Sequence, residues 1–109
     1  MSWVTDVLLI FNVSELYDED INELEEVPAL KGIQSWFAAK GRGMLDNLDE
    51  HAVSGGKVMQ TCVYGGAYNF FERDEFIQMV KAQPWRHPEN VQLLTQDEEE
   101  QRFTLHPII

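Results

Sequence analysis

Val7-Leu8-Leu9-Ile10-Phe11 is the stretch that decides the fold, within a longer segment, residues 3–13, that is rich in β-branched and apolar side chains. Five apolar residues in succession leave no polar face. Such a run is typical of a β-strand that is covered on both faces. We therefore predict that residues 3–13 form a central strand of a sheet and that Asn12 to Ser14 end it.

The segment that follows, residues 14–27, is strongly acidic. Asp18 or Asp20 is a suitable N-cap for a short helix, and carboxylates in a first turn favour the helix dipole. Ile21, Leu24 and Val27 would then form one narrow apolar stripe. We predict a short helix here.

A second helix is predicted from Pro28, because proline is favoured in the first turn, where its missing N–H costs no hydrogen bond. The apolar positions that follow recur at the spacing of an amphipathic helix: Leu30, Ile33, Trp36 and Phe37. Gly41 and Gly43 are expected to end this helix. Residues 44–56 fit either a short edge strand or a helical turn.

A second long strand is predicted over residues 57–64, where the side chains alternate between two faces. Gly65-Gly66 is expected to interrupt it with a bulge, after which residues 67–70 continue it.

The C-terminal part of the chain predicts a helix and a hairpin. Phe76, Met79 and Val80 form one face of the helix, which Pro84 stops. Residues 90–95 and 101–106 then flank an acidic tip, Gln96-Asp97-Glu98-Glu99-Glu100, as in a β-hairpin with a five-residue loop.

These elements predict a single α+β domain over residues 1–109, in the order β-α-α-β-α-β-β. We expect a single layer of antiparallel or mixed sheet with helices on one face. A chain of 109 residues with 44% hydrophobic residues is large enough to bury a core without disulfides.

The formal net charge of −11 limits the kinds of partner that the protein can bind. Such a surface repels nucleic acid phosphates and anionic lipid, so we expect no binding to nucleic acid or to membranes. It favours a basic protein partner. Solubility alone would also account for the charge.

The single cysteine, Cys62, excludes an internal disulfide and favours a reducing compartment. Residues 1–6 lack the basic region of a signal peptide, and the apolar run at 7–11 is too short to span a membrane. We therefore expect a cytoplasmic protein.

Catalytic and metal-binding patterns are absent from the sequence. His51, His87 and His106 are not spaced as metal ligands, and Cys62 lies in the middle of a strand, where a cysteine is usually a small buried apolar residue. Gly65-Gly66 has neither the lysine nor the glycine spacing of a phosphate-binding loop. We predict a protein that is not an enzyme and uses no cofactor and no metal.

Two acidic patches are candidates for a partner-binding surface, since carboxylates clustered in this way are relieved of mutual repulsion by a basic partner. Trp85, beside Arg86 and His87, is a candidate aromatic anchor. The predicted partner-binding residues are Asp18, Glu19, Asp20, Glu23, Trp85, Asp97, Glu98, Glu99 and Glu100.

Several stretches of the C-terminal half form a recognisable set: Tyr64-Gly65-Gly66-Ala67-Tyr68-Asn69, Pro84-Trp85, Pro88-Glu89-Asn90-Val91-Gln92-Leu93-Leu94, Asp97-Glu98-Glu99 and Phe103. With these stretches, the C-terminal half resembles small uncharacterised bacterial proteins of the toxin-immunity type. The resemblance implies a small cytoplasmic α+β protein that blocks a partner by binding it. It assigns no active-site residue.

The leading hypothesis is a non-enzymatic, acidic protein-binding domain, such as an immunity-type inhibitor of a basic toxin. The alternative is an oligomer that binds or converts a small molecule in a pocket near Gly65-Gly66. A structural or assembly subunit is a third possibility, and the sequence leaves the oligomeric state open.

Overall fold

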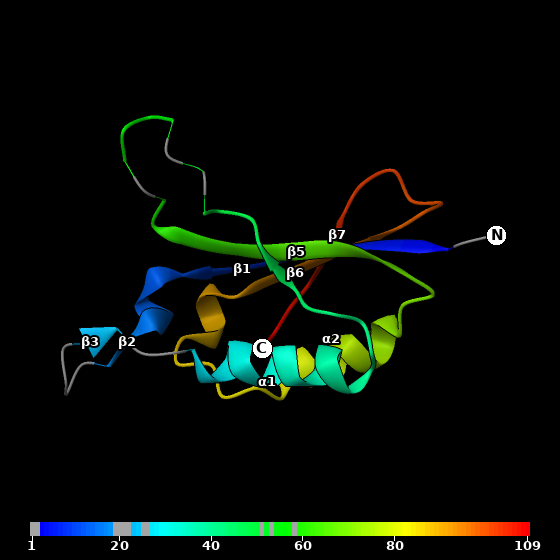
Figure 1. The fold of residues 1–109 in the computed structure, drawn as a ribbon, viewed down its shortest axis with the longest axis horizontal. Coiled ribbons are helices and arrows are strands. Elements are labelled where there is room, and N and C mark those ends of the chain that lie inside the picture. The colour runs from blue at the N-terminus through cyan, green and yellow to red at the C-terminus, as the bar shows by residue number, and fades with distance from the viewer. Residues whose placement is uncertain (1–2, 19–22, 25–26, 51, 53, 58) are drawn as a thin grey trace.

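β1, residues Val4–Asn12, lies at the centre of a five-stranded antiparallel sheet in the order β4-β5-β1-β6-β7. The computed structural model describes residues 3–18, 23–24, 27–50, 52, 54–57 and 59–109. The remaining strands of this sheet and the two α-helices are β4 Asp46–Asn47, β5 Thr61–Asn69, β6 Gln92–Asp97, β7 Thr104–His106, α1 Pro28–Ala39 and α2 Arg73–Lys81. Both helices cover the same face of the sheet (Figure 1). The predicted α+β class is therefore confirmed, with an antiparallel sheet.

Side chains along β1 alternate between a buried face and a more exposed face. The buried positions face the helices: Thr5, Val7, Leu9 and Phe11. On the other face Leu8 and Ile10 are half-buried and Asp6 is exposed. The central position of this strand was predicted correctly, but the expectation that both of its faces are covered is wrong.

The core lies between the sheet and the two helices. α1 contributes Ile33 and Phe37, and α2 contributes Phe76 and Val80, all of them fully buried. The ring of Phe37 lies 5.0 Å from that of Tyr68 on β5 and 5.6 Å from that of Phe76. Aromatic pairs at such separations add about 0.5–1.5 kcal/mol beyond the burial of their area. The aromatic residues thus fix both helices against the sheet.

The acidic segment after β1 does not form the predicted helix where the structure describes it. A 3₁₀ turn, η1 (Val13–Leu16), leads into β2 (Tyr17–Asp18), which pairs antiparallel with β3 (Glu23–Leu24). A helix would place several carboxylates one turn apart, where like charges destabilise it. The order of strands and α-helices is therefore β-β-β-α-β-β-α-β-β, and the predicted order is wrong at its first helix and in its number of strands.

The chain between α1 and β5 adopts one of the two alternatives that the sequence left open, a short edge strand. β4 pairs with β5, with Asp46 opposite Gly65. The carboxamide of Gln34 on α1 holds the chain just before β4, since it donates to the carbonyl of Leu45 at 2.8 Å and accepts from its N–H at 2.9 Å.

β5 continues through Gly65-Gly66 without the predicted bulge, because each of its residues lies opposite one residue of β1. Glycine is favoured at both positions because a Cβ atom there would lie too close to neighbouring atoms. A Cβ at Gly65 would lie 2.5 Å from the carbonyl oxygen of Val7 and 2.9 Å from a methyl carbon of Leu48. A Cβ at Gly66 would lie 2.5 Å from the hydroxyl oxygen of Tyr68.

The terminal hairpin is present, but its tip lies two to three residues later than predicted. β6 continues to Asp97 because Gln96 and Asp97 pair with Asp6 and Thr5 of β1. Residues 98–103 therefore connect β6 to β7, in place of the predicted tip at residues 96–100.

The close approach at Gly65 yields a stability prediction. Replacing Gly65 by alanine should destabilise the fold by about 1–3 kcal/mol, because the added methyl group meets a backbone oxygen that cannot move without disturbing the sheet. Urea denaturation measures the loss. Gly55→Ala is the matched control, since a Cβ at Gly55 meets nothing within 4 Å. Equal stability of the two variants would contradict the packing argument.

Candidate functional site

Trp85 lies in the core and not on the surface. It is 8% exposed, its indole N–H donates to the carbonyl of Val80 at 2.9 Å, and its ring lies 5.5 Å from that of Phe11. The expected aromatic anchor is therefore a structural residue, because both its apolar body and its polar atom are used inside the fold.

In the described part of the acidic segment, the carboxylate of Glu15 is buried. Glu15 is 1% exposed, and its side-chain oxygens accept the backbone N–H groups of Arg86 at 3.0 Å and His87 at 2.6 Å. The guanidinium of Arg86 also donates to the carbonyl of Glu15 at 2.6 Å. These bonds tie η1 to the loop after α2, so Glu15 stabilises the fold and does not contribute to the acidic surface.

Of the other predicted binding residues in this segment, the structure places the backbones of Asp18 and Glu23 opposite each other. Glu19 and Asp20 lie outside the described residues. This patch therefore remains a prediction.

The four carboxylates predicted at the hairpin tip divide into two pairs. Asp97 accepts the hydroxyl of Thr5 at 2.7 Å and the guanidinium of Arg73 at 2.7 Å. Glu100 accepts the N–H of Asp97 at 2.8 Å and lies 3.3 Å from Arg73. Glu98 and Glu99 are exposed. Asp97 and Glu100 thus hold the hairpin to α2, while Glu98 and Glu99 face solvent.

An exposed aromatic residue that the sequence did not identify lies at the same end of the sheet. Phe70 is 63% exposed and has a φ of 49°, in the left-handed region that side chains other than glycine rarely adopt. Its N–H donates to the carbonyl of Trp3 at 2.7 Å. Glu98 is adjacent, since its carboxylate lies 3.4 Å from the N–H of Val4. We call the group of Trp3, Phe70, Glu98 and Glu99 the acidic sheet end.

Arg42 holds Phe70 in this conformation. Its guanidinium donates to the carbonyls of Asn69 and Phe70, at 2.6 Å each, and to the carboxylate of Glu72. It also lies over the ring of Phe71, 5.5 Å from the centroid. The hydrogen bond from Arg42 lowers the pKa of Glu72. Four contacts from one side chain thus fix the turn that exposes Phe70.

Several basic side chains are engaged within the fold. Lys40 lies 2.7 Å from Glu75, Arg42 pairs with Glu72, and Arg73 pairs with Asp97. Since the chain has 19 acidic residues and 8 Lys plus Arg, these pairs leave an excess of carboxylates at the surface.

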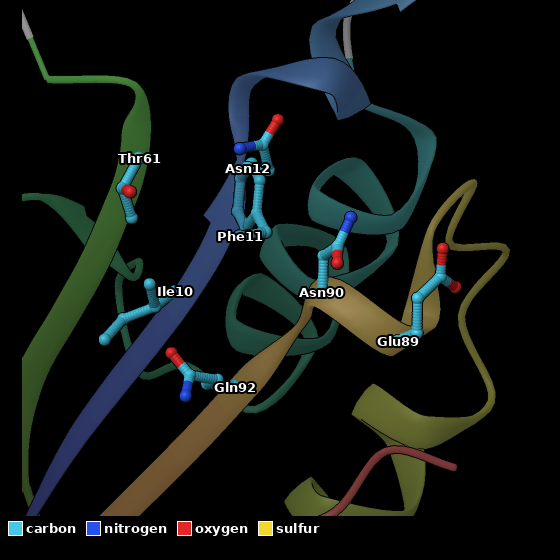
Figure 2. A pocket seen from close by; sticks show the side chains of 7 residues that line it. All are labelled: Ile10, Phe11, Asn12, Thr61, Glu89, Asn90 and Gln92. Atoms are coloured by element: carbon cyan, nitrogen blue, oxygen red, sulfur yellow. The ribbon is translucent and has the colours of Figure 1, made fainter.

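A polar notch opens at the other end of the sheet, where β1 and β6 separate. Their last paired residues are Ile10 and Gln92, because η2 (Pro88–Asn90) turns the chain away before β6 begins. The notch has a volume of about 380 Å³, and Figure 2 shows the side chains around it: Ile10, Phe11, Asn12, Thr61, Glu89, Asn90 and Gln92. Three carboxamides and one hydroxyl can bind an uncharged polar group, but the lining residues include no cysteine, serine or histidine for nucleophilic catalysis.

The space around Gly65-Gly66 is filled, in contrast to the pocket considered there. Leu48 and Leu8 occupy the space over Gly65, and the Tyr68 phenol occupies that over Gly66. The Tyr68 hydroxyl donates to the carbonyl of Met44 at 2.6 Å, and burial, together with Asp46, raises the pKa of Tyr68 to about 12. Tyr68 is therefore a neutral structural donor at physiological pH.

The cysteine and histidine residues show no catalytic pairing in the described part of the chain. Cys62 is buried, and burial and then the charge of Asp49 raise its pKa, which disfavours the reactive thiolate. His87 Nδ1 lies 3.5 Å from Glu89, His106 Nε2 lies 2.7 Å from the hydroxyl of Thr95, and His51 lies outside the described residues. Among the residues described, no three His, Cys, Asp or Glu side chains converge as a metal site would need.

None of the described helices combines the length and apolar character needed to cross a membrane. Comparison of the chain with protein-family models, with curated proteins and with solved structures gives no match.

The two kinds of hairpin carboxylate should differ in their effect on stability. Asp97→Ala should destabilise the fold by about 1–3 kcal/mol, because it leaves the Thr5 hydroxyl without its acceptor and leaves Arg73 with only its longer contact to Glu100. Glu99→Ala, the matched control, should change stability by about 0.5 kcal/mol or less. Thermal and urea denaturation compare the two variants. A neutral effect of Asp97→Ala would mean that this network does not stabilise the hairpin.

His106 should make stability depend on pH. Desolvation and then the charges of Arg73 and Lys81 lower its pKa in the folded protein. The unfolded chain therefore binds more protons below about pH 6.5, and stability is lost as pH falls through the folded pKa. His106→Gln should remove this part of the dependence, so the stability difference between wild type and variant should change between pH 7.5 and pH 5.5 in urea titrations. Parallel curves would contradict the assignment.

Proposed function

We propose that this chain is a non-enzymatic protein-binding domain that recognises a basic protein partner through the acidic sheet end. The observation that carries the proposal is Phe70, an exposed aromatic residue whose backbone is held in a strained conformation at the same end of the sheet as two solvent-facing carboxylates. Strained residues that the surrounding structure holds in place are concentrated at functional sites.

Phe70 has the properties of a binding anchor. Its backbone is fixed by Arg42 and by Trp3, so little backbone entropy is lost when a partner covers the ring. Aromatic residues held in this way contribute a large share of the binding energy at protein interfaces. The ring would occupy an apolar pocket on the partner.

Glu98 and Glu99 supply the electrostatic part of the recognition. They are exposed, whereas Asp97 and Glu100 are paired with Arg73. Exposed charges at the rim of an interface act mainly by accelerating association with a partner of opposite charge. An inhibitor that blocks a basic toxin, as expected for an immunity-type protein, is one class of protein with this requirement.

A second candidate function is the binding of a small, uncharged polar molecule in the notch between β1 and β6. It is favoured by the carboxamides of Asn12, Asn90 and Gln92, which line one cavity. This cavity lies at the opposite end of the sheet from Phe70, so substitution of Asn90 separates the two candidates.

The proposal is tested with purified wild-type and variant chains used to capture proteins from the native host at low and at high salt. A protein of high pI should be retained by wild type and by Asn90→Ala, and lost on Phe70→Gly. Glycine relieves the left-handed strain, so Phe70→Gly should keep wild-type stability within about 1 kcal/mol, and the loss reports on the ring itself.

Kinetics with the captured protein then distinguish the two parts of the surface. Phe70→Gly should increase the dissociation rate, while Glu98→Gln with Glu99→Gln should slow association and flatten its salt dependence. Capture of the same proteins by all variants at equal rates would overturn the proposal.

A further inference from the structure

The face of the sheet opposite the helices is apolar along its middle and almost free of charge. Four strands place these residues on it, as the strand register requires: Val4, Asp6, Leu8, Ile10, Asn12, Thr61, Val63, Gly65, Ala67, Asn69, Gln92, Leu94, Gln96 and Leu105. On the edge strand β4, Asp46 lies opposite Gly65, so Asp6 and Asp46 are the charged residues that the register places on this face. In a chain with 25% charged residues, a sheet face exposed only to water would carry more.

A row of leucines crosses this face at right angles to the strands. Leu8 lies opposite Gly65 on one side and Leu94 on the other, and Leu94 lies opposite Leu105. At the β4 edge Asp46 lies opposite Gly65, and the side chain of Leu48, just after β4, extends the apolar row by reaching over Gly65. Leu48 is 50% exposed and Leu105 is 52% exposed, so both ends of the row are open to a partner.

Two loops project from the sheet on the same side as this row, away from the helices, one from each end of the long strands (Figure 1). One loop precedes β5 and carries the exposed Glu50, and the other is the hairpin tip with Glu98 and Glu99. Asp6 and Asp46, also exposed, lie in the sheet between them. Lys57 and Arg102 are the Lys and Arg residues of these loops, so carboxylates predominate on both sides of the leucine row.

We propose that the leucine row binds an amphipathic helix of the partner protein, with the apolar stripe of that helix on the row and its Lys and Arg side chains toward the two acidic loops. The net charge of the chain favours a basic helix over a second copy of this chain as the molecule that covers the leucine row. A second copy of this chain carries the same net charge of −11 and is repelled, whereas a basic helix is attracted. The inference rests on the proposed function for the basic character of the partner and adds the element that is recognised.

The length of the leucine row matches that of one helix of moderate length. Five strands separated by about 4.8 Å give a row about 19 Å long, which about 13 helical residues match at a rise of about 1.5 Å each. A helix placed in this way buries leucines at spacings of three and four residues, as in other helix-binding grooves.

The test uses a fluorescein-labelled peptide of about 14 residues. It contains only lysine and leucine, with leucine at positions i, i+3, i+4 and i+7. Fluorescence anisotropy measures its affinity for the wild-type chain and for variants. Leu105→Gln and Leu94→Gln should each weaken binding about tenfold, as expected for loss of a central apolar anchor. Binding should also weaken as salt is added.

Matched controls make the result specific to the face. Ile109→Gln removes an apolar side chain that is 80% exposed outside the leucine row and should leave binding unchanged. A peptide of the same composition in scrambled order, and one with glutamate in place of lysine, should each bind at least about tenfold more weakly. Leu105 is the more exposed of the two substituted leucines, so Leu105→Gln keeps the test valid if Leu94→Gln reduces folding.

Two results would overturn the inference. One is peptide binding that is absent, or equal in wild type and both leucine variants. The other is a wild-type dimer in sedimentation that Leu105→Gln converts to a monomer, because a second copy would then occupy the row. Phe70→Gly should not affect peptide binding, so loss of the leucine-row effect with retention of the Phe70 effect on the native partner would leave the proposed function standing.

Discussion

The pairing of β1 along both of its edges is the constraint on which the rest of the structure depends. Because β5 and β6 are each held in register with β1, the side chain at every second position must point to the same face. The side chains of Leu9 and Phe11 therefore face the helices, and those of Leu8 and Ile10 lie on the opposite face. A shift of one residue in either pairing would exchange the two sets, so the core and the open face are fixed by the same hydrogen bonds.

The two α-helices, β1 and the end of α1 could be predicted from sequence because each depends on local pattern, whereas β5 begins at Thr61, four residues later than predicted. Ile33 and Phe37 repeat with the helical period, and Gly41 adopts the positive φ, 67°, expected where a helix ends. The local pattern could not predict that the helices cover only one face of the sheet. An unbroken apolar run in β1 is equally consistent with a strand buried on both faces and with a strand that is buried on one face and partly exposed on the other.

The candidate site could be predicted only in part, because charge in a sequence does not show which carboxylates are already bonded. Glu15 and Asp97 belong to acidic runs, yet each accepts hydrogen bonds from residues far away in the chain. Trp85 follows a proline in a loop and is nevertheless in the core. Phe70 gave no signal, since its exposure results from a left-handed turn that Arg42 stabilises from a different part of the chain.

The distribution of charge separates carboxylates that stabilise the fold from carboxylates that are exposed to solvent. Arg42 and Arg73 each bridge segments that are distant in sequence, and each does so by neutralising a carboxylate within the fold. Among the residues that the structure describes, Glu98 and Glu99 remain at the surface without an ion pair in the fold, and Glu98 makes only a long hydrogen bond with the N–H of Val4. Such a division has a physical reason: a partner that drew Asp97 or Glu72 into its own ion pairs would loosen the hairpin or the turn at Phe70. The recognition that we propose through Glu98, Glu99 and Phe70 would avoid this conflict, because Asp97 and Glu72 would keep their bonds within the fold while Glu98 and Glu99 supply the charge.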